Sequence, residues 1–429
     1  MESLATFPVP ILFDKPEPAH RGRRGPTRRW TIHPAPTLSW ARFEGYDILA
    51  ELDGAEALTL SQRYRDTLLW AATKLHDRPG LFCSTPEPLP EAHPLSGALA
   101  VLNRVVVAPE SVNSRSVARA CLEVSQWGAA GGWLATEYLF ALLAARAANR
   151  DHEFAFAAGR AARRQGRFED AKSLFRRAIA LSRRTGDEAG YANAFLGWAI
   201  MEEKRGDLSA ARTKFVRALR AASRGGLPEL VAATRHNMIA LALADRDFPE
   251  GQGHIVAAYK LYGADNPQLY RLANDAAGFW SAFGYFAIAL PLFERALPHV
   301  VRPDERIAIL ANISRAAAGL GQRQRFLSAW TEAVSLDRHG GESMPDIYME
   351  LARGAQSLGY NVKAQELARE AVAWATQRGY PAKRAAAERM LGELQEGRGA
   401  DPAQAPSPAL TRFARRFTQR LRYLDSAQD

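Results

Sequence analysis

Residues 166–178 read Gly-Arg-Phe-Glu-Asp-Ala-Lys-Ser-Leu-Phe-Arg-Arg-Ala, and the pattern of this stretch returns five more times along the chain. A turn residue is followed by a large apolar residue two positions on, a small residue three further, a large apolar residue four further and an alanine three further. Successive copies start 40, 40, 38, 37 and 38 residues apart, and a fixed period of this length predicts a solenoid. With some departures from the pattern, the copies are Gly166-Phe168-Ala171-Phe175-Ala178, Gly206-Leu208-Ala211-Phe215-Ala218, Arg246-Phe248-Gly251-Ile255-Ala258, Gly284-Phe286-Ala289-Phe293-Ala296, Gly321-Arg323-Phe326-Trp330-Ala333 and Gly359-Asn361-Ala364-Ala368-Ala371.

The stretches between these copies carry apolar residues at spacings of three and four, which predicts helices. Each unit is therefore expected to be two antiparallel helices, with the glycine at the tight turn between them, where a residue without a side chain is favoured. The small residue lets the two helices approach, and the following aromatic fills the space beside them. One pair cannot bury its apolar face alone, so neighbouring pairs are expected to stack around a shared core.

These positions resemble the signature of the tetratricopeptide repeat (TPR) family, in a form similar to the repeats of bacterial signalling regulators and kinesin light chains. Gly159 and the copy at Gly166 match best, with Ala162 in place of the usual tyrosine. The third copy departs, with Arg246 at the glycine position, and the fifth puts bulky Phe326 at a small-residue position, where wider packing is expected.

The resemblance covers residues 112–397 and implies an all-α, right-handed α-solenoid of six to seven TPR-like helical hairpins with N- and C-terminal caps. A weaker seventh copy begins at Gly131. The period near 40, longer than the 34 residues typical of the family, implies longer helices or longer turns, as at residues 184–187.

Composition divides the rest of the chain into four segments. Residues 1–44 are rich in Pro, Arg and Gly without helical or strand periodicity, which predicts a flexible basic arm. Residues 45–111 contain an amphipathic helix over 58–77 and a proline-rich stretch, and are expected to form an N-terminal helical cap. Residues 398–409 are expected to be a Pro/Gly/Ala linker, and residues 410–429 a basic amphipathic helix.

The last of these helices has an apolar face and a basic one. Docking on its own solenoid or on a sister chain and contact with an anionic membrane are the alternatives that this pattern leaves open. Leu410, Phe413, Phe417, Leu421 and Leu424 share one face, and Arg412, Arg415, Arg416, Arg420 and Arg422 lie largely off it.

The net charge of +10 is concentrated in the two tails rather than along the repeats. Residues 14–30 carry +4 and residues 410–429 carry +3, which argues against a long nucleic-acid-binding face on the solenoid. The two cysteines are too few for a disulfide framework and lack metal-site spacing. No signal peptide or membrane span is expected, and the chain is predicted to be cytoplasmic.

No sequence motif of catalysis is evident. The chain has no Gly-Lys-Ser/Thr phosphate loop, no His-Glu-x-x-His and no Cys-x-x-Cys, and the glycine-rich residues 128–132 lie in a helical region. We therefore expect a protein that is not an enzyme and has no cofactor, metal site or catalytic residue.

In the TPR family the first helix of each pair lines a concave groove, which places residues six, nine and ten positions before each turn in that groove. Asparagine amides at these positions can bind the backbone of an extended peptide, and arginine can bind a carboxylate. Bridging of adjacent helices by the same side chains is the structural alternative. The predicted binding residues are Arg160, His236, Asn237, Asn274, Asn312, Arg315 and Arg353.

The leading hypothesis is a non-enzymatic scaffold or regulator, of the bacterial regulator type, that binds a protein or peptide segment in the groove. The alternative is a nucleic-acid-associated regulator that contacts phosphates through Arg21–Arg29 and Arg412–Arg422. A homodimer is possible, and neither the partner nor the pathway is identified by the sequence.

Overall fold

In the computed structural model, residues 95–107, 111–130, 134–263, 266, 268–300, 303–336, 343–377, 379–398 and 402–426 are described. The expected arm of residues 1–44 and most of the expected cap, including the helix over 58–77, lie outside these ranges. The described residues are helices joined by short turns, without a strand among them, which confirms the all-α class. The chain divides into two compact units, Met1–Leu181 and Ser182–Asp429, which are described separately.

The first unit contains α3 to α6 and most of α7. Helix α3 lies in the expected N-terminal cap, and α4 and α5 pack as an antiparallel pair where the weaker seventh copy was predicted. Buried Glu137 of α5 and Arg164 of α6 form an ion pair of 3.0 Å, which explains a charge within an apolar helix. The bounds are α3 Ser96–Val107, α4 Ser114–Ala130, α5 Leu134–Ala147, α6 His152–Arg164 and α7 Phe168–Thr185.

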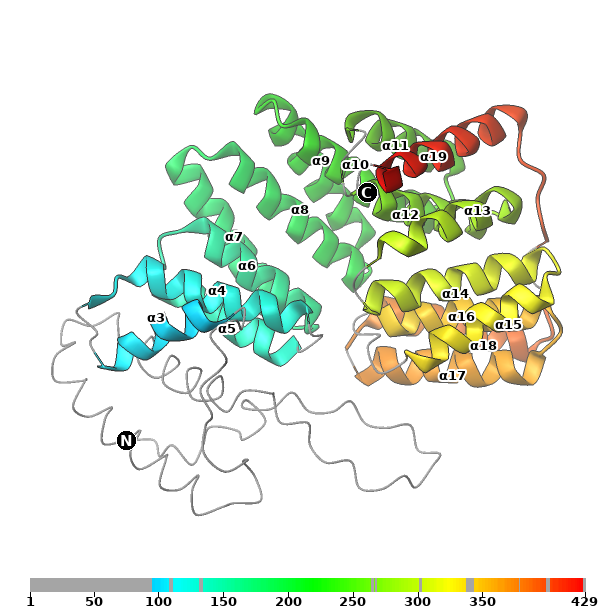
Figure 1. The fold of residues 1–429 in the computed structure, drawn as a ribbon, viewed down its shortest axis with the longest axis horizontal. Helices are drawn as coiled ribbons and strands as arrows, with labels where there is room; N and C mark the ends of the chain where they lie inside the picture. Colours follow the sequence, from blue (N-terminus) through cyan, green and yellow to red (C-terminus); the bar gives the residue numbers. More distant parts are fainter. Residues whose placement is uncertain are drawn as a thin grey trace, which may run out of the picture. The chain divides into compact units, whose positions relative to one another are not determined.

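The second unit contains five helical hairpins, a further helix α18 and the C-terminal helix α19 (Figure 1). The first helices of the hairpins are α8, α10, α12, α14 and α16, and the second helices follow each of them. The bounds are α8 Glu188–Arg205, α9 Leu208–Arg224, α10 Pro228–Ala244, α11 Phe248–Leu261, α12 Leu269–Ala282, α13 Phe286–Ala296 with the short 3-10 turn Leu297–His299, α14 Pro303–Gly319, α15 Arg323–Ser335, α16 Met344–Ser357, α17 Asn361–Gln377, α18 Pro381–Gln395 and α19 Pro408–Ser426.

Each of the six predicted turn residues lies between two helices and has a positive φ. Five are glycines, for which this left-handed conformation has no steric cost. The residue at the third turn is Arg246, the one non-glycine residue with positive φ in the described ranges. Its backbone strain is on the order of 1 kcal/mol. The angles are 74° at Gly166, 89° at Gly206, 56° at Arg246, 81° at Gly284, 71° at Gly321 and 80° at Gly359.

The turns are short, and the long period comes from the helices. Helices α7 and α8 have 18 residues each, and α9 and α10 have 17 each. The turn expected over residues 184–187 is reduced to Gly186 and Asp187, because Arg184 and Thr185 belong to α7. Asp187, Asp207 and Asp247 follow the turns as N-caps, and each side chain accepts a hydrogen bond from a backbone N–H of the next helix.

Aromatic rings packed over glycines join the helices of neighbouring hairpins. The ring of Phe279 on α12 lies where a Cβ of Gly251 on α11 would be, and Phe286 on α13 lies in the same way over Gly319 on α14. Phe326, the bulky residue at a small-residue position, is buried because Gly354 on the next hairpin has no side chain, and a Cβ there would lie 3.1 Å from the ring. The compensating small residue is therefore on the following hairpin.

Helix α19 docks on its own solenoid, where it contacts α12 and α13 (Figure 1). Its predicted apolar face is the docked one, with Leu410, Phe413, Phe417 and Leu421 all buried. The ring of Phe413 lies 5.3 Å from that of Tyr259 and 6.2 Å from that of Trp280, and Phe417 lies 4.8 Å from Tyr259. The membrane alternative therefore loses its apolar surface in this structure, and in the described residues no helix is both long and apolar enough to cross a membrane.

Three hydrogen bonds fix the position of α19 and of the linker before it. Arg420 donates hydrogen bonds to the backbone carbonyls of Tyr259 at 2.7 Å and Tyr262 at 2.5 Å, which satisfies acceptors at the C-terminal end of α11. In the linker, the N–H of Gln404 donates to the carbonyl of Gly284 at 2.8 Å. A Cβ at Gly284 would lie 2.5 Å from the carbonyl oxygen of Pro402, so this turn glycine also makes room for the linker.

Gly251→Ala is expected to destabilise the protein by about 1–3 kcal/mol, because its Cβ meets the ring of Phe279. The control is Gly253→Ala in the same helix, where no atom lies within 4 Å of the added carbon and alanine stabilises by about 0.5–1 kcal/mol. Urea unfolding followed by circular dichroism measures both changes. Equal effects of the two substitutions would show that the ring-over-glycine contact does not hold the hairpins.

Phe417→Ala is expected to release α19 from the solenoid, because truncation of a buried phenylalanine costs about 3–5 kcal/mol. Trypsin should then cleave after Arg412, Arg415 and Arg416 faster than in the unmodified protein, while the hairpins keep their helical content. Gln419→Ala, an exposed neighbour, is the matched control and should leave the cleavage rate unchanged.

Candidate binding site

The first helices of the second unit form a continuous face. Helices α10, α12, α14 and α16 contact one another in succession, whereas adjacent second helices are held further apart. Residues at the same distance before each turn therefore line up across this face, which we call the inner face. It carries six of the seven predicted binding residues, namely His236, Asn237, Asn274, Asn312, Arg315 and Arg353.

A row of side-chain hydrogen bonds crosses the inner face from α10 to α14. The Nε2 atom of buried His236 lies 2.8 Å from Oδ2 of Asp275, whose side chain is 53% exposed. Asn274 donates from Nδ2 to Oδ1 of Asp275 at 3.1 Å, and Asn312 donates from Nδ2 to Oδ1 of Asn274 at 3.2 Å. We call these four residues the polar row.

The polar row is compatible with both predicted roles of its residues, ligand binding and the bridging of adjacent helices. The amides bridge helices, as the structural alternative requires, but each amide has four hydrogen-bonding positions and uses only some of them here. Asn312 engages one N–H, and within the described residues its Oδ1 accepts no hydrogen bond. Both asparagines are partly exposed, so the row keeps donors and acceptors for a ligand.

Four of the seven predicted residues do not join the row, and two of these, Asn237 and Arg160, make contacts within their own helices. Asn237 donates from Nδ2 to the carbonyl of Ala233 at 2.8 Å and so bonds to its own helix. Arg160 belongs to the other unit, where its guanidinium lies 5.9 Å from the ring centroid of Phe156.

Arg315 and Arg353 meet at one carboxylate, that of Glu350. Arg315 donates from Nη1 to Oε2 of Glu350 at 2.7 Å, and Arg353 donates to Oε1. Burial by itself raises the pKa of Glu350, but the charges and hydrogen bonds of Arg315 and Arg353 outweigh it and hold the pKa below its usual range. The side chains of Arg315 and Glu350 are 6% and 19% exposed, so this is a nearly buried ion pair.

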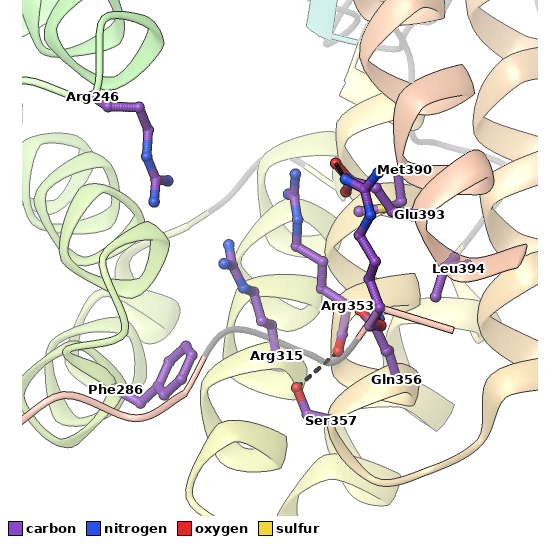
Figure 2. A pocket seen from close by; sticks show the side chains of 10 residues that line it. Arg246, Phe286, Arg315, Arg353, Gln356, Ser357, Met390, Glu393 and Leu394 are labelled. Carbon is purple, nitrogen blue, oxygen red and sulfur yellow. Dashed lines mark hydrogen bonds and ion pairs between the residues drawn. The ribbon is translucent and has the colours of Figure 1, made fainter. Parts of the chain in front are cut away.

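Beside this pair lies a cavity of about 290 Å³, which we call the arginine cavity (Figure 2). It brings together the Arg246 turn, the start of α13, the inner-face helices α14 and α16, and the end of α18. Helix α18 contacts α8, and Ala382 at its start lies against the Gly206 turn, so the helix runs near the edge that carries the turns. The lining residues are Arg246, Phe286, Arg315, Arg353, Gln356, Ser357, Met390, Glu393, Leu394 and Arg398.

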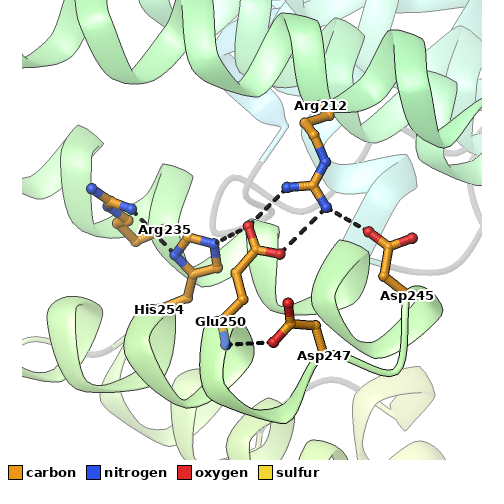
Figure 3. Close-up of polar contacts among 6 residues, drawn as sticks. All are labelled: Arg212, Arg235, Asp245, Asp247, Glu250 and His254. Carbon is orange, nitrogen blue, oxygen red and sulfur yellow. Dashed lines mark hydrogen bonds and ion pairs between the residues drawn. The ribbon is translucent and has the colours of Figure 1, made fainter.

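An ion-pair network holds the turn that carries Arg246 (Figure 3). Arg212 of α9 donates to Asp245 at 2.5 Å and to Glu250 of α11 at 2.8 Å. His254 lies 3.6 Å from Glu250 through Nε2, and burial and the charge of Arg235 lower the pKa of His254. The residues before and after Arg246 are thus tied to helices α9 and α11, because Asp247 also caps α11.

Several residues of the site were not predicted. Asp275 and Glu350 lie nine positions before their turns, and this spacing does place them on the inner face. That their carboxylates would accept hydrogen bonds from the predicted residues was not expected. Arg246 was treated only as a degenerate turn, although an arginine where the other copies have glycine is a usable signal. Arg398 gave no signal, since it falls at the start of the linker.

Burial raises the pKa values of two side chains, one beside the polar row and one in the core of the first unit. Burial raises the pKa of Tyr262, whose hydroxyl lies 3.5 Å from Nδ1 of His236, to about 12. Burial likewise raises the pKa of the Cys121 thiol to about 12, so little thiolate forms at neutral pH. In the described ranges no three His, Cys, Asp or Glu side chains gather as metal ligands would.

No protein-family model matches the chain, and no curated protein matches it. Among solved structures it is similar to BtubC (BKLC) from P. vanneervenii, at 16% identity over 53% of this chain and 91% of that chain with a TM-score of 0.39. It is also similar to a signal transduction ATPase with numerous domains and a tetratricopeptide repeat sensor from Pyrococcus horikoshii, at 13% identity over 76% of this chain and 49% of that chain with a TM-score of 0.44.

A third similar structure is the Rap conjugation gene regulator of plasmid pLS20 in complex with the Phr* peptide. The identity is 12% over 91% of this chain and 95% of that chain, and the TM-score is 0.42. The repeats are TPR-like because of the hairpins, turn glycines and small residues described above.

Glu350→Gln is expected to destabilise the protein by about 3 kcal/mol, because it removes the carboxylate that pairs with the buried guanidinium of Arg315. Since the folded-state pKa of Glu350 is depressed, its contribution is complete above pH 4.5, the ordinary carboxyl pKa, and is lost as the pH falls through the folded-state value. The stability difference from the unmodified protein should therefore be constant at neutral pH and shrink in acid.

The control is Glu366→Gln, which removes an exposed partner of Lys363 and should change stability little. Thermal unfolding at several pH values measures both variants. A Glu350→Gln variant that unfolds at the same temperature as the unmodified protein would contradict the role of the buried pair.

Proposed function

We propose that the inner face binds an extended segment of a partner protein or peptide and that the protein acts as a non-enzymatic scaffold or regulator. The polar row is the observation that carries this proposal. Its residues come from three consecutive first helices, so their free donors and acceptors are spread along one direction, as the backbone of an extended segment requires.

A binding role suits these groups better than a catalytic one. The pair of His236 and Asp275 has the composition of a general base, but burial raises the pKa of Tyr262, the hydroxyl beside it, and so makes that hydroxyl harder to deprotonate than usual. The amides of Asn274 and Asn312 have no acid–base function in water and act by hydrogen bonding alone.

The nucleic-acid alternative retains one supporting observation. With the apolar face of α19 docked, Arg412, Arg415 and Arg416 are exposed on its outer side. Such a surface can contact phosphates, although three arginines on one helix are a small footprint for that purpose.

Asn274→Ala combined with Asn312→Ala is expected to abolish or strongly reduce capture of the partner from cells of the native host, because both amides of the polar row are lost. This pair is preferred to changes at Arg315, whose loss would disturb the buried partner Glu350. Affinity capture with mass spectrometry measures the effect, and circular dichroism should show unchanged helical content.

The control is Asn361→Ala, an exposed asparagine at the start of α17 and outside the inner face. Nuclease treatment before capture distinguishes the nucleic-acid alternative from the proposed protein binding. A partner that is bridged by nucleic acid is lost after this treatment even from the unmodified protein. Equal recovery of one nuclease-resistant partner by the double variant and by the unmodified protein would refute the assignment to the polar row.

A further inference from the structure

Helices α9, α11 and α19 lie on the side of the second unit that faces away from the first helices, and their exposed residues are strongly basic (Figure 1). Helix α9 contains five basic residues and no acidic residue. Residues 408–421 of α19 contain four arginines and no acidic residue. Helix α11 has one carboxylate, that of Glu250, and it pairs with Arg212 of α9. The exposed cations of these helices, which we call the basic surface, are Arg217, Arg220, Arg224, Lys260, Arg412, Arg415 and Arg416.

Helical spacing brings these cations into rows. Arg217, Arg220 and Arg224 follow one another at steps of three and four, so they share the solvent-facing side of α9. Lys260 lies fourteen positions after the turn residue of its hairpin, as Arg220 does in the hairpin before it, and therefore continues the row onto α11. The arginines of α19 share the side opposite to its docked apolar face.

The three helices are fixed to one another, so the basic surface is preformed. The pairing of Arg212 with Glu250 connects α9 to α11 (Figure 3). Arg420 of α19 donates to the carbonyls of Tyr259 and Tyr262 at the end of α11. A ligand that contacts all three helices therefore binds without the cost of ordering them.

The cations of the basic surface are not neutralised by the protein. Within the described residues none of the seven pairs with a carboxylate, whereas on the outer side of α17 Lys363 pairs with Glu366. Arg220 and Arg224 are separated by four positions on α9, and Arg412 and Arg416 by four on α19. Like charges at this spacing destabilise a helix, and a bound anion removes the repulsion.

The dimensions of the α9 row match a chain of phosphates. At 1.5 Å per residue the row from Arg217 to Arg224 is about 10 Å long. Phosphates of one strand of a duplex advance by about 3.4 Å, so the row spans about three of them. Guanidinium groups donate two parallel hydrogen bonds to a phosphate.

The absence of exposed apolar groups separates this surface from a membrane-binding one. Among the large apolar side chains that are exposed in the described residues, Leu261 alone belongs to α9, α11 or α19. A helix that binds at a membrane surface inserts an apolar face, and that of α19 is already buried. The described residues of these helices also present no exposed aromatic ring on which unpaired bases would stack, which favours a duplex over a single strand.

We propose that the basic surface of α9, α11 and α19 binds the phosphate backbone of a nucleic-acid duplex. The contacts are to phosphates, so binding is independent of base sequence. The surface lies away from the inner face, and the inference does not depend on the proposed function. A partner segment on the inner face and a duplex on the outer side occupy separate sites.

The test measures binding of the full chain to a fluorescein-labelled DNA duplex of about 20 base pairs by anisotropy, at several salt concentrations. Two double variants, Arg220→Gln with Arg224→Gln and Arg412→Gln with Arg416→Gln, should each lower the slope of log affinity against log salt by about two, because one phosphate contact contributes about 0.9. An RNA duplex of the same sequence shows which of the two nucleic acids is bound more tightly.

The matched control is Lys363→Gln with Arg369→Gln, which removes the same charge from the exposed side of α17 and should keep the slope of the unmodified protein. The basic run Arg21–Arg29 is present in every variant, so its contribution cancels. Circular dichroism should show equal helical content in all of them.

No binding of the duplex by the unmodified protein, or an unchanged slope in both α9 and α19 variants, would overturn the inference. An equal loss in the α17 control would reduce the effect to net charge and overturn it too. Tighter binding of the single strand, or binding of anionic phosphatidylserine vesicles without binding of the duplex, would assign the surface to another ligand. Capture of a protein partner through Asn274 and Asn312 is unaffected by each of these results.

Discussion

In the second unit, aromatic rings packed over glycines set how neighbouring hairpins approach one another. Phe279 over Gly251, Phe286 over Gly319 and Phe326 beside Gly354 each join one hairpin to the next. Because interiors are close-packed, a ring can lie there only if the opposite residue has no side chain. The inner face depends on this spacing, since its hydrogen bonds tolerate only small changes in the distance between first helices.

The architecture was predictable because it is repeated. Six turns at a constant period determine the hairpins, and the positive φ at all six confirms that the turn position was identified correctly even where arginine replaces glycine. The bulky Phe326 was harder to interpret, because its compensating residue, Gly354, lies on the next hairpin rather than in the same copy of the pattern. Side-chain size at one position of a repeat has meaning only together with the residue that faces it.

The sequence predicted which helix face carries the candidate site, but not which hydrogen bonds its residues form. Helical geometry places residues nine and ten before the turn on one face, and His236, Asn274 and Asn312 do lie there in one hydrogen-bonded row. The same geometry could not show that Asn237 bonds to Ala233 of its own helix. It also could not show that Asp275 and Glu350 each accept hydrogen bonds from two side chains. Which side chains pair with one another depends on distances between helices, and these distances are not encoded by spacing along one helix. The arginine cavity brings Arg246 and Arg398 together from distant parts of the chain, which no local pattern encodes.

The docking of α19 has a consequence for how the solenoid unfolds. Most contacts in a stack of hairpins are between neighbours, so such proteins lose their repeats in steps along the array. Arg420 and Phe417 connect α11 to a segment about 160 positions later, and α12 and α13 are held in the same contact. These helices therefore form one cooperative unit with the tail, and their amide protons are expected to exchange with solvent together rather than one hairpin at a time.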